Sequence, residues 1–283
     1  MAEGNTDDGR RYLDRKGTRL CYVQRGRGPA VVLVQGLGLP GRMWLELPQS
    51  LLAHGFSVVI PDNRGTGHSA APWPPYSMAQ LADDLDAVIR DSGAGSAIVV
   101  GLSLGGMIVQ HLALRHPQLV RGLVLAATSC GLPHGKFPNL RLGVLLPRAL
   151  RGDRRAMQEV RRLLVHPESL GANPRLFELW DQQMSPAAGP TVGWQGMLGQ
   201  LSAHTTHSTG FRLSRIGCPT VVIAGQDDRI LPADNSRILA ERIPGAELVM
   251  LPQAGHAFPL ERPGELLAAI RRVHARAGAD PQG

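Results

Sequence analysis

The sequence predicts an α/β fold in which a mainly parallel central sheet is flanked by helices. Short apolar runs alternate along the chain with longer stretches of helical periodicity, which is the pattern of consecutive β-α-β units. The runs at 30–35 (AVVLVQ) and 97–101 (AIVVG) are continuously apolar, as is typical of parallel strands buried on both faces. Residues 131–216 break this alternation, so we expect a helical insertion late in the core.

Strands and helices alternate in sequence order through the predicted core. We expect strands at 20–23, 30–35, 56–61, 97–101, 122–127, 220–224 and 247–251. We expect helices at 43–54, 78–90, 104–115, 234–242 and 265–276. Ser77 is a suitable N-cap for the second of these helices, in which Leu81, Leu85 and Ile89 have helical spacing. Pro263 precedes the last helix, and proline is favoured in a first turn.

The predicted insertion is helical and is interrupted by prolines. Residues 155–164 have an amphipathic helical pattern, and prolines occur at 167, 174, 186 and 190. A helical segment inserted between two core strands is typical of a cap over a binding site. We therefore expect an N-terminal part of the core at 1–130, a helical cap at 131–216 and a C-terminal part of the core at 217–283.

The formal net charge of +7 raises the question of a nucleic-acid or anionic-lipid partner. Lys16 and Lys136 are the only lysines, and the use of arginine throughout the chain indicates a compositional bias. No recognisable DNA- or RNA-binding motif accompanies the charge, so no nucleic-acid partner is expected. Arginines are concentrated at 141–162, where we expect a solvated helix face.

No apolar run approaches the roughly 20 residues that span a bilayer, so no membrane span is expected. The first ten residues are polar and acidic and show no apolar signal, which predicts a cytoplasmic protein. Cys21, Cys130 and Cys218 lie far apart without the spacing of metal ligands, so no metal site is expected. The sequence leaves the oligomeric state open, with a homo-oligomer among the alternatives.

The segment 101–105 (GLSLG) matches the G-x-S-x-G pattern between a strand-like run and a helical run. In such a nucleophile elbow the strand turns sharply into the helix, and larger side chains beside Ser103 would collide. Gly101 and Gly105 supply the small flanking residues. The sequence therefore predicts Ser103 as a catalytic nucleophile.

A serine nucleophile needs a base that is itself held by an acid, in the order Ser, Asp or Glu, His along this fold. Asp228 follows the strand at 220–224, and His256 follows the strand at 247–251. We predict Asp228 as the acid and His256 as the base. Asp227 is the alternative acid, because it is adjacent in the same loop.

A developing oxyanion needs backbone N–H donors that point at it. We predict the N–H groups of Leu104, directly after Ser103, and of Leu37, in the glycine-rich loop after the strand at 30–35. Large apolar side chains that could line a substrate pocket, or belong to the core, form a separate group. They are Trp44, Met107, Trp180 and Trp194.

A second glycine-rich loop, at 62–69 (DNRGTGHS), contains Asp62 and Arg64. We considered a catalytic role for both residues. We favour a salt bridge that stabilises the turn below the site.

Together these residues resemble the α/β-hydrolase superfamily over nearly the whole chain except the cap. The matching motifs are GLSLGG (101–106), DNRGTGHS (62–69), GQDDRILP (225–232) and GH (255–256). The resemblance implies an α/β-hydrolase fold, no metal or organic cofactor, and a small-molecule ester or lactone substrate. A serine at the elbow speaks against haloalkane dehalogenases and epoxide hydrolases, which carry aspartate there.

Within the superfamily, the segment GLSLGGMIVQHLALRHP resembles carboxylesterases and 3-oxoadipate enol-lactonases. The QGLG loop is similar to that of bacterial esterases that include anthracycline methylesterases. Gln35 stands where many relatives carry histidine, which affects the subfamily more than the triad.

The sequence thus predicts a serine esterase that acts on a small to medium apolar ester through an acyl-enzyme on Ser103. The alternatives are a lactone or enol-lactone hydrolase, a C–C bond hydrolase or lyase, or a cofactor-free perhydrolase with the same triad. A non-catalytic receptor on this scaffold is disfavoured, because such a protein usually lacks a member of the triad.

Overall fold

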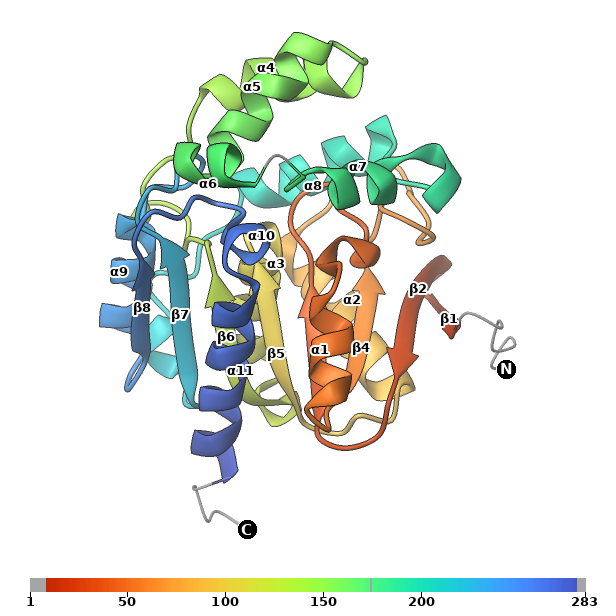
Figure 1. Ribbon diagram of the computed structural model, residues 1–283. Helices are drawn as coiled ribbons and strands as arrows, with labels where there is room; N and C mark the ends of the chain where they lie inside the picture. Colours follow the sequence, from red (N-terminus) through yellow and green to blue (C-terminus); the bar gives the residue numbers. More distant parts are fainter. Residues whose placement is uncertain (1–8, 174, 279–283) are drawn as a thin grey trace.

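The computed structural model describes residues 9–173 and 175–278, and within them eight strands form one sheet (Figure 1). The order across the sheet is β1-β2-β4-β3-β5-β6-β7-β8. Strand β2 is antiparallel to its neighbours β1 and β4, and the pairs from β4 to β8 are parallel. The strands are β1 (Arg10–Arg15), β2 (Thr18–Arg25), β3 (Ala30–Val34), β4 (Ser57–Asp62), β5 (Ala97–Leu102), β6 (Val120–Ala126), β7 (Thr220–Gly225) and β8 (Glu247–Leu251).

Helices cover both faces of the sheet, because the side chains of the central strands alternate between two apolar layers. On one face Val32, Val99 and Leu123 pack against helices α2, α3 and α9. On the other face Val31 and Ile98 pack against α1 and α11. The helices of the core are α1 (Leu47–Ala53), α2 (Met78–Asp91), α3 (Leu104–Arg115), α9 (Asp234–Arg242), the short α10 (Phe258–Glu261) and α11 (Pro263–Gly278).

A helical insertion follows β6 and lies over the carboxyl ends of the parallel strands (Figure 1). Its helices are α4 (Arg141–Leu150), α5 (Arg154–Leu164), α6 (Pro167–Ala172), α7 (Glu178–Met184) and α8 (Trp194–Thr205). Short 3₁₀ turns are η1 (Gly41–Trp44), η2 (Pro117–Leu119), η3 (Pro186–Ala188) and η4 (Leu213–Arg215). The insertion places helical segments next to the loops that carry the predicted site.

The predicted fold class is confirmed, including the mainly parallel sheet and the late helical insertion. The bounds of the three predicted parts stay a prediction. Residues 1–8, Pro174 and residues 279–283 lie outside the described residues. Among the described residues, none of the helices is both long and apolar enough to cross a membrane.

Two local expectations differ from the structure. The expected helix at 43–54 is divided into η1 and α1, with Leu45 between them at φ 51°. Pro48 lies in the first turn of α1, where proline is tolerated, whereas it would disrupt the interior of a longer helix. Strand β1 was not expected, because it is a mostly polar, half-buried edge strand rather than an apolar run.

Candidate active site

Ser103 lies in the tight turn between β5 and α3, with φ 55° and ψ −116°. Non-glycine residues rarely adopt such a positive φ, which indicates a strained backbone. A side chain at Gly105 would collide with the carbonyl oxygen of Val34, so the turn needs glycine there. The Ser103 N–H donates to the Ala126 carbonyl (2.9 Å), and Thr128 Oγ1 donates to the Ser103 carbonyl (2.7 Å). These bonds fix the serine at the carboxyl end of β5.

Asp228 and His256 meet at the ends of β7 and β8. The distance between Asp228 Oδ2 and His256 Nδ1 is 2.7 Å. The other carboxylate oxygen of Asp228 accepts the N–H groups of Ile230 (2.8 Å) and Leu231 (2.9 Å). The Asp228 side chain is 1% exposed and that of His256 is 8% exposed. Backbone donors thus hold one oxygen of a buried carboxylate and leave the other for the imidazole.

Asp227 points elsewhere. Its side chain is 46% exposed, and Asp227 Oδ2 lies 3.8 Å from Nε2 of His166 in the insertion. Of the two adjacent aspartates, the structure therefore joins Asp228 to His256.

The predicted oxyanion donors belong to two segments next to the serine. Leu104 begins α3, and N–H groups in the first turn of a helix have no intrahelical acceptor. In the loop after β3, a Cβ built on Gly36 would be 3.4 Å from Ser103 Cβ and 4.0 Å from Ser103 Oγ. The next residue is Leu37. Within the described residues, neither Leu37 nor Leu104 uses its N–H in a hydrogen bond, so both donors are available.

In the described part of the chain, the Ser103 hydroxyl also has no hydrogen bond. The contact between Ser103 and His256 therefore belongs to the proposal below. The strand order nevertheless places their loops at one edge, since β5, β6, β7 and β8 are parallel neighbours. Residues at the carboxyl ends of adjacent parallel strands share such an edge.

Glu261 is a residue at this site that was not predicted. One of its oxygens accepts the N–H of Gly255 (2.7 Å), directly before His256, and the other accepts the N–H of His166 in the insertion (2.8 Å). The N–H of Ala257 also donates to the carbonyl of Leu164 (2.7 Å). The insertion is thus fastened to the loop that carries the histidine.

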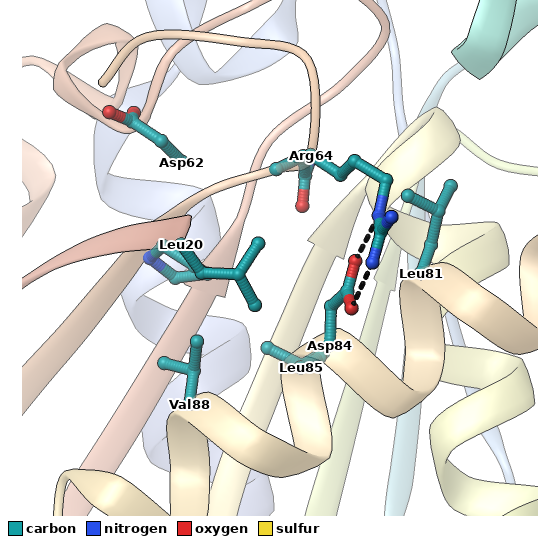
Figure 2. Close-up of a pocket in the computed structure, with 9 residues that line it drawn as sticks. Leu20, Asp62, Arg64, Leu81, Asp84, Leu85 and Val88 are labelled. Carbon is teal, nitrogen blue, oxygen red and sulfur yellow. Dashed lines mark hydrogen bonds and ion pairs between the residues drawn. The ribbon is translucent and has the colours of Figure 1, made fainter. Parts of the chain in front are cut away.

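The predicted salt bridge between Asp62 and Arg64 is wrong. Arg64 instead forms a two-point ion pair with Asp84 of α2, at 2.7 and 2.8 Å, as Figure 2 shows. The Asp62 carboxylate accepts the N–H groups of Gly41 (2.7 Å) and His68 (2.8 Å). Arg64 and Asp84 are both buried, and they line a cavity of about 10 Å³, roughly the room for one water molecule.

The four predicted pocket residues lie in different surroundings, and their role in substrate binding stays a prediction. Trp44 and Met107 are buried in the two apolar layers of the core. Trp180 packs beside Phe177 in the insertion. Trp194 is 59% exposed and its ring contacts that of Trp73.

A buried histidine pair ties the end of the insertion to the core. His207 Nδ1 is 3.3 Å from His111 Nε2 on α3, and His207 Nε2 is 3.0 Å from the Ser129 carbonyl. Because a carbonyl only accepts, Nε2 of His207 carries the proton. Burial and the charges of Arg212 and Arg115 lower the pKa of His111 to about 4. Burial and the neighbouring His111 lower the pKa of His207 to about 3.

Within the described residues, no group of three or more His, Cys, Asp or Glu side chains is arranged to hold a metal ion. A groove of about 520 Å³ lies elsewhere, between β2, η1 and α7. Ser103, Asp228 and His256 are not among the residues that line this groove.

Comparison with known proteins gives a consistent family. The family model described as "alpha/beta hydrolase fold" matches residues 29–263. The chain is 35% identical over 234 residues to the Klebsiella pneumoniae subsp. pneumoniae protein named "Putative carbamate hydrolase RutD", covering 81% of this chain and 85% of that protein.

Solved structures agree with this family. A hydrolase from Pseudomonas aeruginosa PA01 is similar with a TM-score of 0.78 and 28% identity, covering 95% of this chain and 99% of that chain. Est816, described as an N-acyl homoserine lactone degrading enzyme, is similar with a TM-score of 0.76 and 29% identity, covering 92% of this chain and 98% of that chain. The family match and the identity over most of both chains show that this chain belongs to the hydrolases with the alpha/beta hydrolase fold.

Proposed function

We propose that the protein is a serine hydrolase that cleaves a carboxylic ester of a small to medium apolar substrate. In the first half of the reaction, Ser103 Oγ attacks the ester carbonyl carbon and His256 Nε2 takes the hydroxyl proton. Asp228 accepts the Nδ1–H bond, which fixes the ring and stabilises the imidazolium that forms. The imidazolium then gives its proton to the leaving alcohol, and an acyl-enzyme remains on Ser103.

In the second half, water attacks the acyl-enzyme by the same route. His256 takes a proton from the water, and the imidazolium returns it to Ser103 Oγ as the tetrahedral intermediate collapses, which releases the acid and restores the Ser103 hydroxyl. In both halves the N–H groups of Leu37 and Leu104 donate to the oxyanion. Each such donor typically contributes about 2.7–4 kcal/mol of transition-state stabilisation.

The observation that supports this proposal most is the 2.7 Å bond between His256 and a buried carboxylate whose second oxygen is held by two backbone N–H groups. This arrangement gives the imidazole a fixed tautomer with Nε2 as the acceptor. An imidazole whose Nε2 is the acceptor is suited to take the proton of a serine hydroxyl at a strained strand-to-helix turn.

The test is the hydrolysis of p-nitrophenyl acetate and butyrate by wild type and by Ser103→Ala. We expect kcat to fall by a factor on the order of 10⁵–10⁶ in the variant, because the nucleophile is removed. Labelling of wild type by a fluorophosphonate, and none of Ser103→Ala, should accompany this loss. Equal rates in the two proteins would refute the proposal.

A carbamate is the second candidate substrate, and the 35% identity to the RutD protein favours it. A lactone is a third, given the likeness to the lactone-degrading Est816. Both present a carbonyl carbon that Ser103 could attack in the same way. Comparison of kcat/KM for a p-nitrophenyl ester, a p-nitrophenyl carbamate and an N-acyl homoserine lactone separates the three classes.

A further inference from the structure

Gln200 belongs to helix α8 of the insertion and is fully buried, at 0% exposure, where α8 meets two loops of the core. Its Oε1 accepts the N–H of Gly38 at 2.8 Å. Its Nε2 donates to the carbonyl of Arg64 at 2.9 Å and to Thr66 Oγ1 at 3.1 Å. Both hydrogens of the amide and its oxygen are therefore used, so the side chain has one defined orientation.

Gly38, which Gln200 binds, is adjacent in sequence to Leu37, the proposed oxyanion donor. Gly36 lies against Ser103, and Gly38 has φ 71° and packs against Met197 of α8. Leu37 is the residue between these two glycines. Its peptide N–H can point at Ser103 only while the residues on both sides keep their conformations.

The Gly36 end of the loop is held within the core. The Gly36 N–H donates to Gln35 Oε1 at 3.1 Å, and Asn63 Nδ2 donates to the Gln35 carbonyl at 3.0 Å. The Gly38 end is held by Gln200, which belongs to the insertion. Of these three loop N–H groups, the one at Leu37 is left without an acceptor in the described residues.

The second loop that Gln200 binds, at 62–69, is itself held by polar contacts. Arg64 forms the buried two-point ion pair with Asp84, and Thr66 Oγ1 donates to the Asn63 carbonyl at 2.7 Å. Gln200 thus connects the loop that carries Leu37 to an anchored part of the core. A buried amide that is fully bonded specifies one arrangement of the groups around it.

We propose that Gln200 is a positioning residue through which helix α8 of the insertion aims the Leu37 N–H at the oxyanion. This inference rests on the function proposed above. It assigns to the insertion a part in transition-state stabilisation, in addition to covering the site. Gln200 itself touches neither the substrate nor the reacting atoms.

The first test is Gln200→Met, which keeps the length of the side chain and removes the three hydrogen bonds. We expect kcat for p-nitrophenyl butyrate to fall about 10- to 100-fold. This fall should not exceed the fall in kcat that follows the complete removal of one oxyanion donor. KM should change by less than about threefold, because the interaction with the oxyanion exists only in the transition state. Rates are divided by the concentration of sites that a fluorophosphonate titrates to completion, which excludes unfolded protein.

Gln110→Met is the matched control. Gln110 is also 0% exposed and makes three side-chain bonds, to the carbonyls of Gly106 and Ser129 (both 3.0 Å) and from Thr209 Oγ1 (2.6 Å). Among the described residues, the Gln110 side chain forms no hydrogen bond with the loop at 36–38. We expect a similar loss of thermal stability and a kcat per titrated site within about threefold of wild type.

Gln200→Glu is the rescue variant, because its carboxyl group keeps an acceptor for the Gly38 N–H. Its kcat should lie between those of Gln200→Met and wild type. If Gln200→Met does not fold, Gln200→Glu is compared with Gln110→Glu, and a larger loss of kcat per site in Gln200→Glu supports the inference.

Two results overturn the inference: an unchanged kcat per site in Gln200→Met, or a loss in a Gln110 variant equal to that in the matching Gln200 variant. The proposed function fails by a different observation, the absence of fluorophosphonate labelling of wild type at Ser103. The two failures are therefore distinguishable.

Discussion

The core and the insertion differ in how they are held together. In strands β3 and β5 every residue is buried, and each strand pairs with neighbours on both sides. In helices α6 and α7 of the insertion no residue is buried. Elsewhere the insertion is fastened by apolar contacts, such as those of Val165 and Phe177 with Ala257, and by polar contacts near the site. Gln200, Glu261 and His207 make the best defined of these polar contacts. The core thus fixes where the proposed reacting groups lie, and the insertion meets their loops through a small number of contacts.

The largest loss of activity is expected from Asp228→Asn, a substitution in a loop of the core. We expect kcat to fall about 10⁴-fold, because an amide cannot hold the imidazole in the tautomer that accepts the serine proton. Asp227→Asn is the neighbouring control and should stay within about threefold of wild type, since Asp227 is half exposed and contacts His166. Steady-state kinetics with p-nitrophenyl butyrate measure both, and the reverse ranking would assign the acid to Asp227.

The junction between core and insertion should be sensitive to acid. The pKa values of His207 and His111, about 3 and about 4, lie below the ordinary value of 6.5, so the unfolded chain binds protons more readily. Above pH 6.5 this pair therefore does not reduce the free energy of unfolding. As the pH falls below 6.5, the unfolded chain binds protons that the folded protein does not, and the free energy of unfolding decreases. Each histidine adds up to about 1.4 kcal/mol per pH unit to this slope.

Urea unfolding between pH 6.5 and 5, where few carboxylates titrate, measures the effect of the histidine pair. His207→Leu should reduce the slope of stability against pH relative to wild type, since one of the two buried imidazoles is gone. A slope that is the same in both proteins would show that the pair does not cause the acid sensitivity.

The smallest effect is expected at the surface of the insertion. Trp194→Ala removes an exposed ring whose contact is Trp73, and such an aromatic pair contributes about 0.5–1.5 kcal/mol. We expect a loss of this size in the free energy of unfolding and a KM within about threefold of wild type. A KM raised tenfold or more would instead support the predicted contact of Trp194 with substrate.

The sequence predicted those parts of the molecule that depend on local pattern. Continuous apolar runs identified the buried parallel strands, and GLSLG identified the turn at Ser103 because steric requirements there act between adjacent residues. The polar edge strand β1 has no such pattern and was not expected. The chain positions of Asp228 and His256 after strands were also readable, because strand ends meet at one edge of the sheet.

Contacts between distant residues could not be predicted in this way. The partner of Arg64 is Asp84 on α2, whereas the sequence suggested the nearby Asp62. Gln200 lies 162 residues from Gly38, and nothing in its neighbourhood along the chain marks it as a partner of the loop. Glu261 likewise lies at the end of the short helix α10, where no sequence motif marks it. Such side chains act through the packing of the insertion, which depends on the tertiary structure.

The shared carboxylate of Glu261 limits how the insertion can be exchanged or redesigned. Its two oxygens receive one N–H from the segment before His256 and one from the start of α6. A graft that brings a different lid from another hydrolase would have to supply a backbone donor where His166 now stands. Without that donor, one oxygen of Glu261 would lose its partner in the insertion, and the loop before His256 would lose its connection to the lid.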